Sequence, residues 1–95
     1  MSEPLTFRFE GRREEGKQPV VTCNGEPLEN VKPDVCDWFS WGSDRSPGCI
    51  ALAWSMADVM NHYIDNGNDE VRLMNEMRSA LGRIKGNTWT LELEV

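Results

Sequence analysis

One long apolar segment, from Gly48 to Asp65, limits what this chain can fold into. Its main polar residues recur three and four positions apart and so share one narrow stripe of a helix: Ser55, Asp58, His62 and Asp65. Ser46-Pro47 suits the start of that helix, because serine accepts hydrogen bonds from free N–H groups and proline loses no needed donor. A helix that is apolar over most of its circumference belongs at the centre of a core, with its polar stripe in water.

The rest of the chain predicts a single domain over residues 1–95. Its composition, 39% hydrophobic and 27% charged residues, is typical of a globular domain in water. No apolar run reaches the length of a membrane span, since Asp58 and His62 interrupt the best one. The first residues lack the basic and apolar parts of a signal peptide. We therefore expect a cytoplasmic protein without a membrane partner.

Two periodicities complete a mixed fold. Alternation of apolar and polar residues predicts strands over 5–10, 18–23 and 88–95, and Asn24-Gly25 predicts a tight turn before a short edge piece at 26–29. A second helix is predicted over about Glu70 to Ile84, although Gly82 also suits its end. The order ββ(β)ααβ indicates an α+β domain, with a small antiparallel sheet of about three strands packed against two helices.

Few residues in the chain could carry chemistry. Cys23, Cys36 and Cys49 are evenly spaced, lack a C-x-x-C pair and are accompanied by one histidine, so we expect reduced thiols, no metal and no cofactor. A small hydrolase or transferase is one hypothesis, because a cysteine could pair with His62, which Asp58 could orient. The predicted exposure of His62 and the lack of nucleotide-binding or nucleophile motifs favour the opposite hypothesis, a protein without catalytic residues.

The net charge of −6 is concentrated in the middle of the chain. Between Val20 and Val71 there are nine acidic and two basic residues, whereas the two ends together are nearly balanced. This distribution disfavours direct nucleic-acid binding, which needs cations opposite phosphates. It favours either solubility alone or docking onto a basic protein surface.

The aromatic segment before the first helix is the best candidate for recognition. If residues 38–41 are extended, Phe39 and Trp41 share one side and Trp38 lies on the other, where it could anchor a partner. The alternative is that both tryptophans cover the core. The predicted partner-binding residues lie in this segment, in the loop after it and among the acids before it: Asp37, Trp38, Asp44, Arg45, Glu26, Glu29 and Asp34.

Several short motifs carry a family resemblance. Trp41-Gly42, a short Ser/Gly loop, Pro47 and Ile50-Ala51-Leu52-Ala53 resemble the W-G-Y-G-G-S-G-P-A-Q-L-A-L-A signature of a family of small bacterial and phage proteins of unknown function. Residues 9–13 and 20–28 are similar to the amino-terminal part of that family, and 89–91 to its W-x-L ending. The signature loop differs here, with Ser43-Asp44-Arg45 in place of tyrosine and glycines and one residue fewer.

A shorter likeness covers residues 37–44, which are similar to the D-W-x-x-W-G-T-D segment of a small anti-CRISPR protein that binds the nuclease domain of type II-C Cas9. Both resemblances imply a phage or mobile-element protein that blocks a host machine by binding it. We therefore expect an anti-CRISPR inhibitor, monomeric or homodimeric, that occludes a basic Cas surface in the host cytoplasm. The alternative is a non-catalytic accessory protein unrelated to defence. One form of it self-associates through Met74 and Met77, whose other predicted role is packing in the core.

Overall fold

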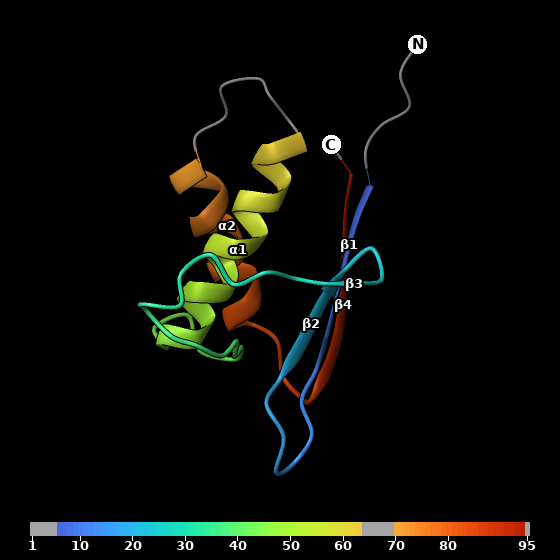
Figure 1. Cartoon of the computed structure of the whole chain (residues 1–95), viewed down its shortest axis with the longest axis vertical. Coiled ribbons are helices and arrows are strands. Elements are labelled where there is room, and N and C mark those ends of the chain that lie inside the picture. The colour runs from blue at the N-terminus through green and yellow to red at the C-terminus, as the bar shows by residue number, and fades with distance from the viewer. Residues whose placement is uncertain (1–5, 64–69, 95) are drawn as a thin grey trace.

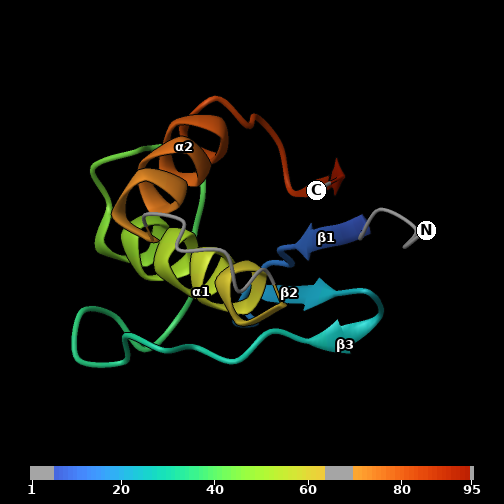
Figure 2. The same ribbon diagram turned by 90° about the horizontal axis from the view of Figure 1, so that it is seen from above.

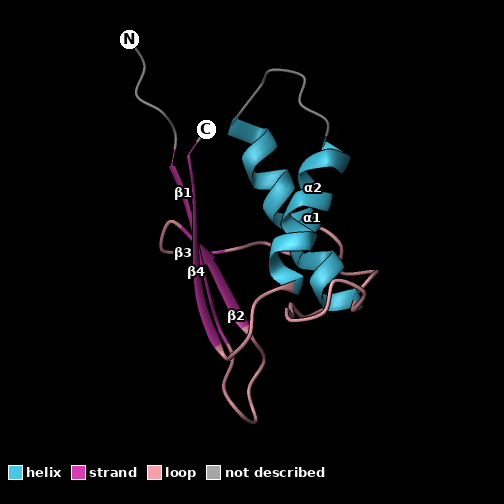
Figure 3. Ribbon diagram, turned by 180° about the vertical axis from the view of Figure 1, so that it is seen from behind, coloured by secondary structure: helices cyan, strands magenta, loops and turns pink. Residues whose placement is uncertain are grey.

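The computed structural model describes residues 6–63 and 70–94. These residues form a four-stranded antiparallel sheet and two helices in the order β-β-β-α-α-β, which confirms the predicted α+β class. The elements are β1 (Thr6–Arg12), β2 (Val20–Cys23), β3 (Glu26–Pro27), α1 (Pro47–Tyr63), α2 (Glu70–Gly82) and β4 (Thr88–Glu94). Both helices lie on the same side of the sheet (Figure 1, Figure 3).

The strand order is β3-β2-β1-β4, so β1 lies inside the sheet and β3 and β4 form its two edges. Phe7 and Phe9 of β1 are buried under the helices, while Thr6, Arg8 and Glu10 are exposed, as alternation predicts. The strand extends past the predicted Glu10, because Gly11 and Arg12 still pair with both neighbouring strands.

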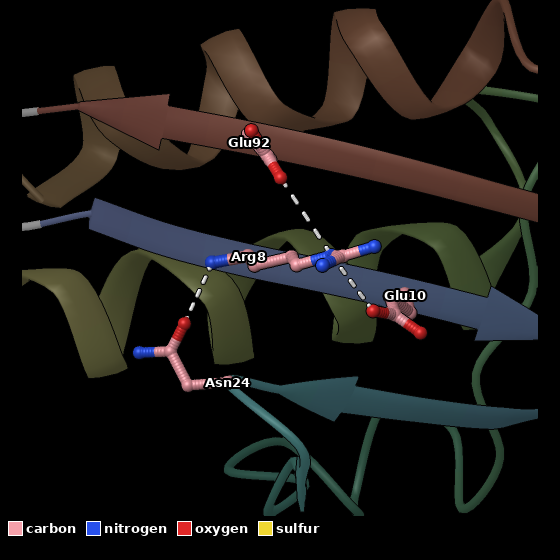
Figure 4. Close-up of polar contacts among 4 residues, drawn as sticks. All are labelled: Arg8, Glu10, Asn24 and Glu92. Carbon is pink, nitrogen blue, oxygen red and sulfur yellow. Dashed lines mark hydrogen bonds and ion pairs between the residues drawn. The ribbon is translucent and has the colours of Figure 1, made fainter.

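The Asn24-Gly25 turn joins β2 to β3 as predicted, since both residues have positive φ, 53° and 86°. Asn24 also ties this turn to β1: its N–H donates to Arg8 O at 2.8 Å, and its Oδ1 accepts from Arg8 N–H at 2.8 Å. On the exposed face, Arg8 Nε lies 2.8 Å from Glu10 Oε1 and 3.6 Å from Glu92 Oε1 (Figure 4). Arg8 is therefore paired with a carboxylate of its own strand and one of the neighbouring strand.

α1 is the centre of the core, and Ser46 caps it. Ser46 Oγ accepts from Cys49 N–H at 3.2 Å, and Ser46 C=O accepts from Ile50 N–H at 3.1 Å. α2 ends at Gly82 and does not continue to Ile84. The largest core side chains come from both helices, the sheet and the segment before α1: Phe7, Phe9, Val21, Phe39, Trp41, Leu52, Met56, Met60, Met74, Met77 and Leu81.

The polar stripe of α1 is only partly in water, which corrects one prediction. Asp58 and His62 are exposed, but Ser55 is 1% exposed because the segment before α1 folds over that side of the helix. Ser55 Oγ donates to Ala51 O at 2.8 Å and accepts from Val31 N–H at 3.1 Å. The fourth member of the stripe, Asp65, lies outside the described residues.

The methionines of α2 belong to the core. Met74 and Met77 are each 7% exposed and pack in the same cluster as the side chains of α1. They are therefore not available as a face for self-association in the folded chain. No described helix is both long and apolar enough to cross a membrane.

Candidate functional site

The predicted site residues centre on the loop of residues 28–46, which we name the acidic loop. It leaves β3, runs along α1 and passes to the side of α2 before it turns into α1 (Figure 2). It carries Glu29, Asp34, Asp37 and Asp44 against Lys32 and Arg45. Although it has no helix or strand, hydrogen bonds and buried aromatic rings fix it to the helices at several points.

The first part of the acidic loop is a compact turn held by Asn30. Asn30 Nδ2 donates to Cys36 O at 2.8 Å, and its Oδ1 accepts from Lys32 N–H at 2.9 Å. Lys32 O in turn accepts from the N–H groups of Val35 and Cys36, at 3.0 and 3.2 Å. The turn is fixed to α1 by the bond from Val31 N–H to Ser55 and by Lys32 Nζ, which lies 5.2 Å from the ring centroid of Trp54.

The aromatic segment divides between core and solvent as its alternation predicts. Phe39 is 7% exposed and Trp41 is 4% exposed, whereas Trp38 is 51% exposed. The alternative in which both tryptophans cover the core is therefore wrong. Val35, 42% exposed, is a second apolar side chain that the loop leaves in solvent. Val35 was not predicted as a site residue, because a lone valine among acids carries no periodicity that would distinguish it.

Trp41 fixes the middle of the acidic loop. Its Nε1–H donates to Gly86 O at 3.0 Å, its ring meets Trp89 edge to face at 5.7 Å, and the guanidinium of Arg13 lies 4.9 Å from its centroid. Arg13 also donates from its backbone N–H to Asn87 O at 2.7 Å. The loop is thus tied to the turn before β4 and to the residue after β1.

The last part of the acidic loop lies against the end of α2. Gly42 adopts a φ of 94° and donates its N–H at 3.0 Å to Leu81 O, a carbonyl in the last turn of that helix that also accepts from Ile84 N–H at 3.2 Å. Asp44 packs on Gly82, where a Cβ would come within 3.0 Å of the Asp44 backbone nitrogen. Asp44 and Arg45 are both exposed, so this packing leaves their side chains accessible.

The acids of the acidic loop take no part in the ion pairs found among the described residues. Those pairs lie on the sheet, on the turn after β1 and on α2: Arg8 with Glu10 and Glu92, Glu14 with Arg12 and Lys17, and Arg72 with Glu76. Glu29, Asp34, Asp37 and Asp44 therefore keep their charge available to an outside partner, and so does Glu26 on β3. Unpaired surface charges attract a surface of the opposite sign over a long range.

Glu26 and Glu29 lie in a different place from Trp38. Together with Asp58, they line an open pocket of about 520 Å³ between β2, β3 and α1, which we name the side pocket. Cys23 and His62 line it too, so the fold brings the only histidine and a thiol to the same hollow. Of the seven predicted residues, Glu26 and Glu29 thus line the side pocket, and the other five lie further along the acidic loop.

The groups in the side pocket are poorly disposed for nucleophilic chemistry. Burial, and then the negative charge of Glu26, raise the pKa of the Cys23 thiol above 9.0, which lowers the thiolate fraction at neutral pH. Ser55 Oγ, the hydroxyl in the pocket, is already engaged by Ala51 and Val31. Among the residues that the structure describes, no three histidine, cysteine or acidic side chains are arranged to hold a metal ion. The three cysteines form no disulfide.

No family model, no curated protein and no solved structure matches the chain.

Proposed function

We propose that this protein is a non-catalytic inhibitor that binds a basic surface of another protein through its acidic loop, with Trp38 as the anchor. The observation that carries the proposal is the exposure of Trp38, 51%, on a loop that the buried side chains of Phe39 and Trp41 fix to the core. A tryptophan held this way presents a large apolar surface and loses little conformational entropy on binding. Val35 extends the apolar contact.

The charges around the anchor support a basic partner. Asp34 and Asp37 flank the two exposed apolar side chains of the loop, and no ion pair of the described residues neutralises them. Glu26 and Glu29, in the side pocket, add to the same negative field from a separate position. Charges at the rim of an interface mainly speed association, whereas the buried anchor slows dissociation.

For the identity of the partner, we propose a Cas effector of a CRISPR system in the bacterial host cytoplasm. The support is the likeness of residues 37–44 to a segment of an anti-CRISPR protein that binds the nuclease domain of type II-C Cas9. Nuclease and nucleic-acid-binding surfaces are basic, because they face phosphates. An acidic domain seated on such a surface blocks nucleic-acid binding or cleavage without any chemistry of its own.

The direct test is a DNA cleavage assay with purified type II-C Cas9 in the presence of increasing amounts of this protein. We expect inhibition and a stable complex. Trp38→Ala should weaken binding about 30-fold, corresponding to about 2 kcal/mol for a buried aromatic anchor. The matched control is Val20→Ala, which truncates an equally exposed side chain, 50%, on the sheet. Unchanged cleavage at a large molar excess of inhibitor would refute the Cas9 assignment.

The charge contribution is tested separately. Asp37→Asn should slow association and flatten its dependence on salt, whereas Glu15→Gln, which removes the same charge from the exposed turn after β1, should leave both unchanged. Equal effects of the two substitutions would mean that only net charge matters. The alternative function, an accessory protein unrelated to defence, predicts that the Trp38 dependence appears with a partner from outside CRISPR systems.

A further inference from the structure

The two edges of the sheet are built differently. β3 is two residues long and includes Pro27, which has no N–H to donate, so this edge offers little to a further strand. β4 has seven residues that pair with β1 in an unbroken register, and it contains no proline, glycine or lysine. β4 is therefore the edge at which the sheet can be extended.

The hydrogen bonds around β1 identify the backbone groups that β4 leaves free. Arg13 N–H donates to Asn87 O at 2.7 Å, one step beyond the paired residues Arg12 and Thr88. Bonded and non-bonded pairs alternate along an antiparallel ladder, so Trp89, Leu91 and Leu93 direct their N–H and C=O groups towards β1. Asn24 N–H, which donates to Arg8 O, gives the same phase on the other side of β1.

It follows that the N–H and C=O groups of four residues point away from the sheet: Thr88, Thr90, Glu92 and Glu94. In the described part of the chain, no strand and no other backbone hydrogen bond engages this edge. The inner row of β4, which is the row of side chains that faces the helices, is also incompletely covered. Trp89, Leu91 and Leu93 are only partly buried, in contrast to their neighbours on β1, Phe7 and Phe9, which are 3% and 0% exposed.

We propose that the free edge of β4 pairs with β4 of a second copy, antiparallel and centred on Leu91, to form one continuous eight-stranded sheet. In this register Leu91 faces Leu91, and Trp89 faces Leu93 of the other copy, so the apolar rows cover each other. On the outer face Thr90 lies opposite Glu92 and Thr88 opposite Glu94. Residues with free backbone groups then meet only residues with free backbone groups, as an antiparallel ladder requires.

Charge selects this register over its neighbours. A two-fold axis at Glu92 would place that glutamate opposite its own copy, which is destabilising. A two-fold axis at Thr90 would leave Glu94 beyond the end of the partner strand and shorten the ladder. The axis at Leu91 uses all seven residues and sets every glutamate opposite a threonine. Arg8, 3.6 Å from Glu92, further offsets the negative charge of the outer face.

The test is the mass of the intact chain in solution, measured by sedimentation over a range of concentrations. We expect a monomer–dimer equilibrium in the wild type. Thr90→Pro should abolish the dimer, since it removes an N–H that points to the free edge and no bond to β1. Circular dichroism checks that this variant keeps its fold. A wild type that is monomeric at every concentration, or a folded Thr90→Pro variant with unchanged association, would overturn the proposal.

The register has its own test, which does not depend on the proline variant. Leu91→Cys and Leu93→Cys are matched substitutions on the same inner row, and only residue 91 faces itself in the proposed dimer. With an added oxidant, Leu91→Cys should form a covalent dimer well above the background of the wild-type thiols, and Leu93→Cys should not. Equal cross-linking of the two would overturn the register. This dimer does not rest on the inhibitor proposal, and each can fail alone.

Discussion

Trp38 and Trp41 lie in the same short segment, yet one is half exposed and the other is part of the core. Trp41 has a hydrogen-bond acceptor, an edge-to-face ring and a cation over its face, all supplied by segments distant in the sequence. None of the ring contacts or hydrogen bonds of the described residues engages the Trp38 indole. The acidic loop is therefore fixed to the core through Trp41, whereas Trp38 stays accessible. The two tryptophans separate a residue needed for folding from a residue available for binding.

The largest expected effect is on the buried side of this comparison. Trp41→Ala should lower the free energy of unfolding by about 3–5 kcal/mol, because it removes a large core side chain and leaves a cavity. Urea denaturation followed by circular dichroism measures this. A loss below about 1 kcal/mol would mean that Trp41 does not hold the loop.

The packing around Trp41 is tested next at Gly11, whose neighbour Trp89 contacts the Trp41 ring. Gly11 faces Trp89 across the β1–β4 pair, and a Cβ at this position would collide with the indole ring. Gly11→Ala should therefore cost about 1–3 kcal/mol through overpacking. Trp89→Leu made in the same chain should recover part of that loss relative to the sum of the single variants, since it clears the space. Strict additivity of the two losses would contradict this explanation.

Cys49, buried at the start of α1, makes the stability of the fold depend on pH. Burial, and then the charge of Asp44, raise its pKa from 9.0 to about 11, although Arg78 acts in the opposite direction. The fold favours the protonated thiol, so this stabilisation is complete below pH 9 and is lost as the pH rises towards 11. Over that window, the wild type should lose about 1–2 kcal/mol more than Cys49→Ala does. Parallel pH profiles would refute the assignment.

The smallest effect on stability is expected at Trp38. Trp38→Ala should change the free energy of unfolding by less than about 0.5 kcal/mol, because the side chain is half in water and is not part of the core cluster. The same thermal or urea measurement used for Trp41→Ala provides the comparison. A loss as large as that of Trp41→Ala would mean that both tryptophans are needed for folding. Trp38 would then not be free to bind a partner.

Local patterns predicted most of the fold. Alternation located β1, β2 and β4, Asn24-Gly25 located the hairpin to β3, and Ser46-Pro47 located the start of α1. Long-range features were not predictable in this way. The periodicity of α1 does not indicate that a distant loop covers Ser55. The alternation within each strand does not indicate that β1 lies between β2 and β4.

The candidate site was only partly predictable for the same reason. Alternation over residues 38–41 correctly separated Trp38 from Trp41, since it depends on neighbouring residues alone. The division of the seven residues between the acidic loop and the side pocket depends on how β3 and the loop pack on α1. The side pocket is also lined by both Cys23 and His62, which lie far apart in the sequence and in different elements.

The pairing of β1 with β4 also affects how the chain folds as it is synthesised. Arg13 and Asn87, bonded at the end of that pair, are 74 positions apart in sequence, so β1 gains its second neighbour only after both helices have left the ribosome. Until then one side of β1 is open to wrong partners. Closing so long a segment slows folding, so the pairing of β4 with β1 is expected to be a late step.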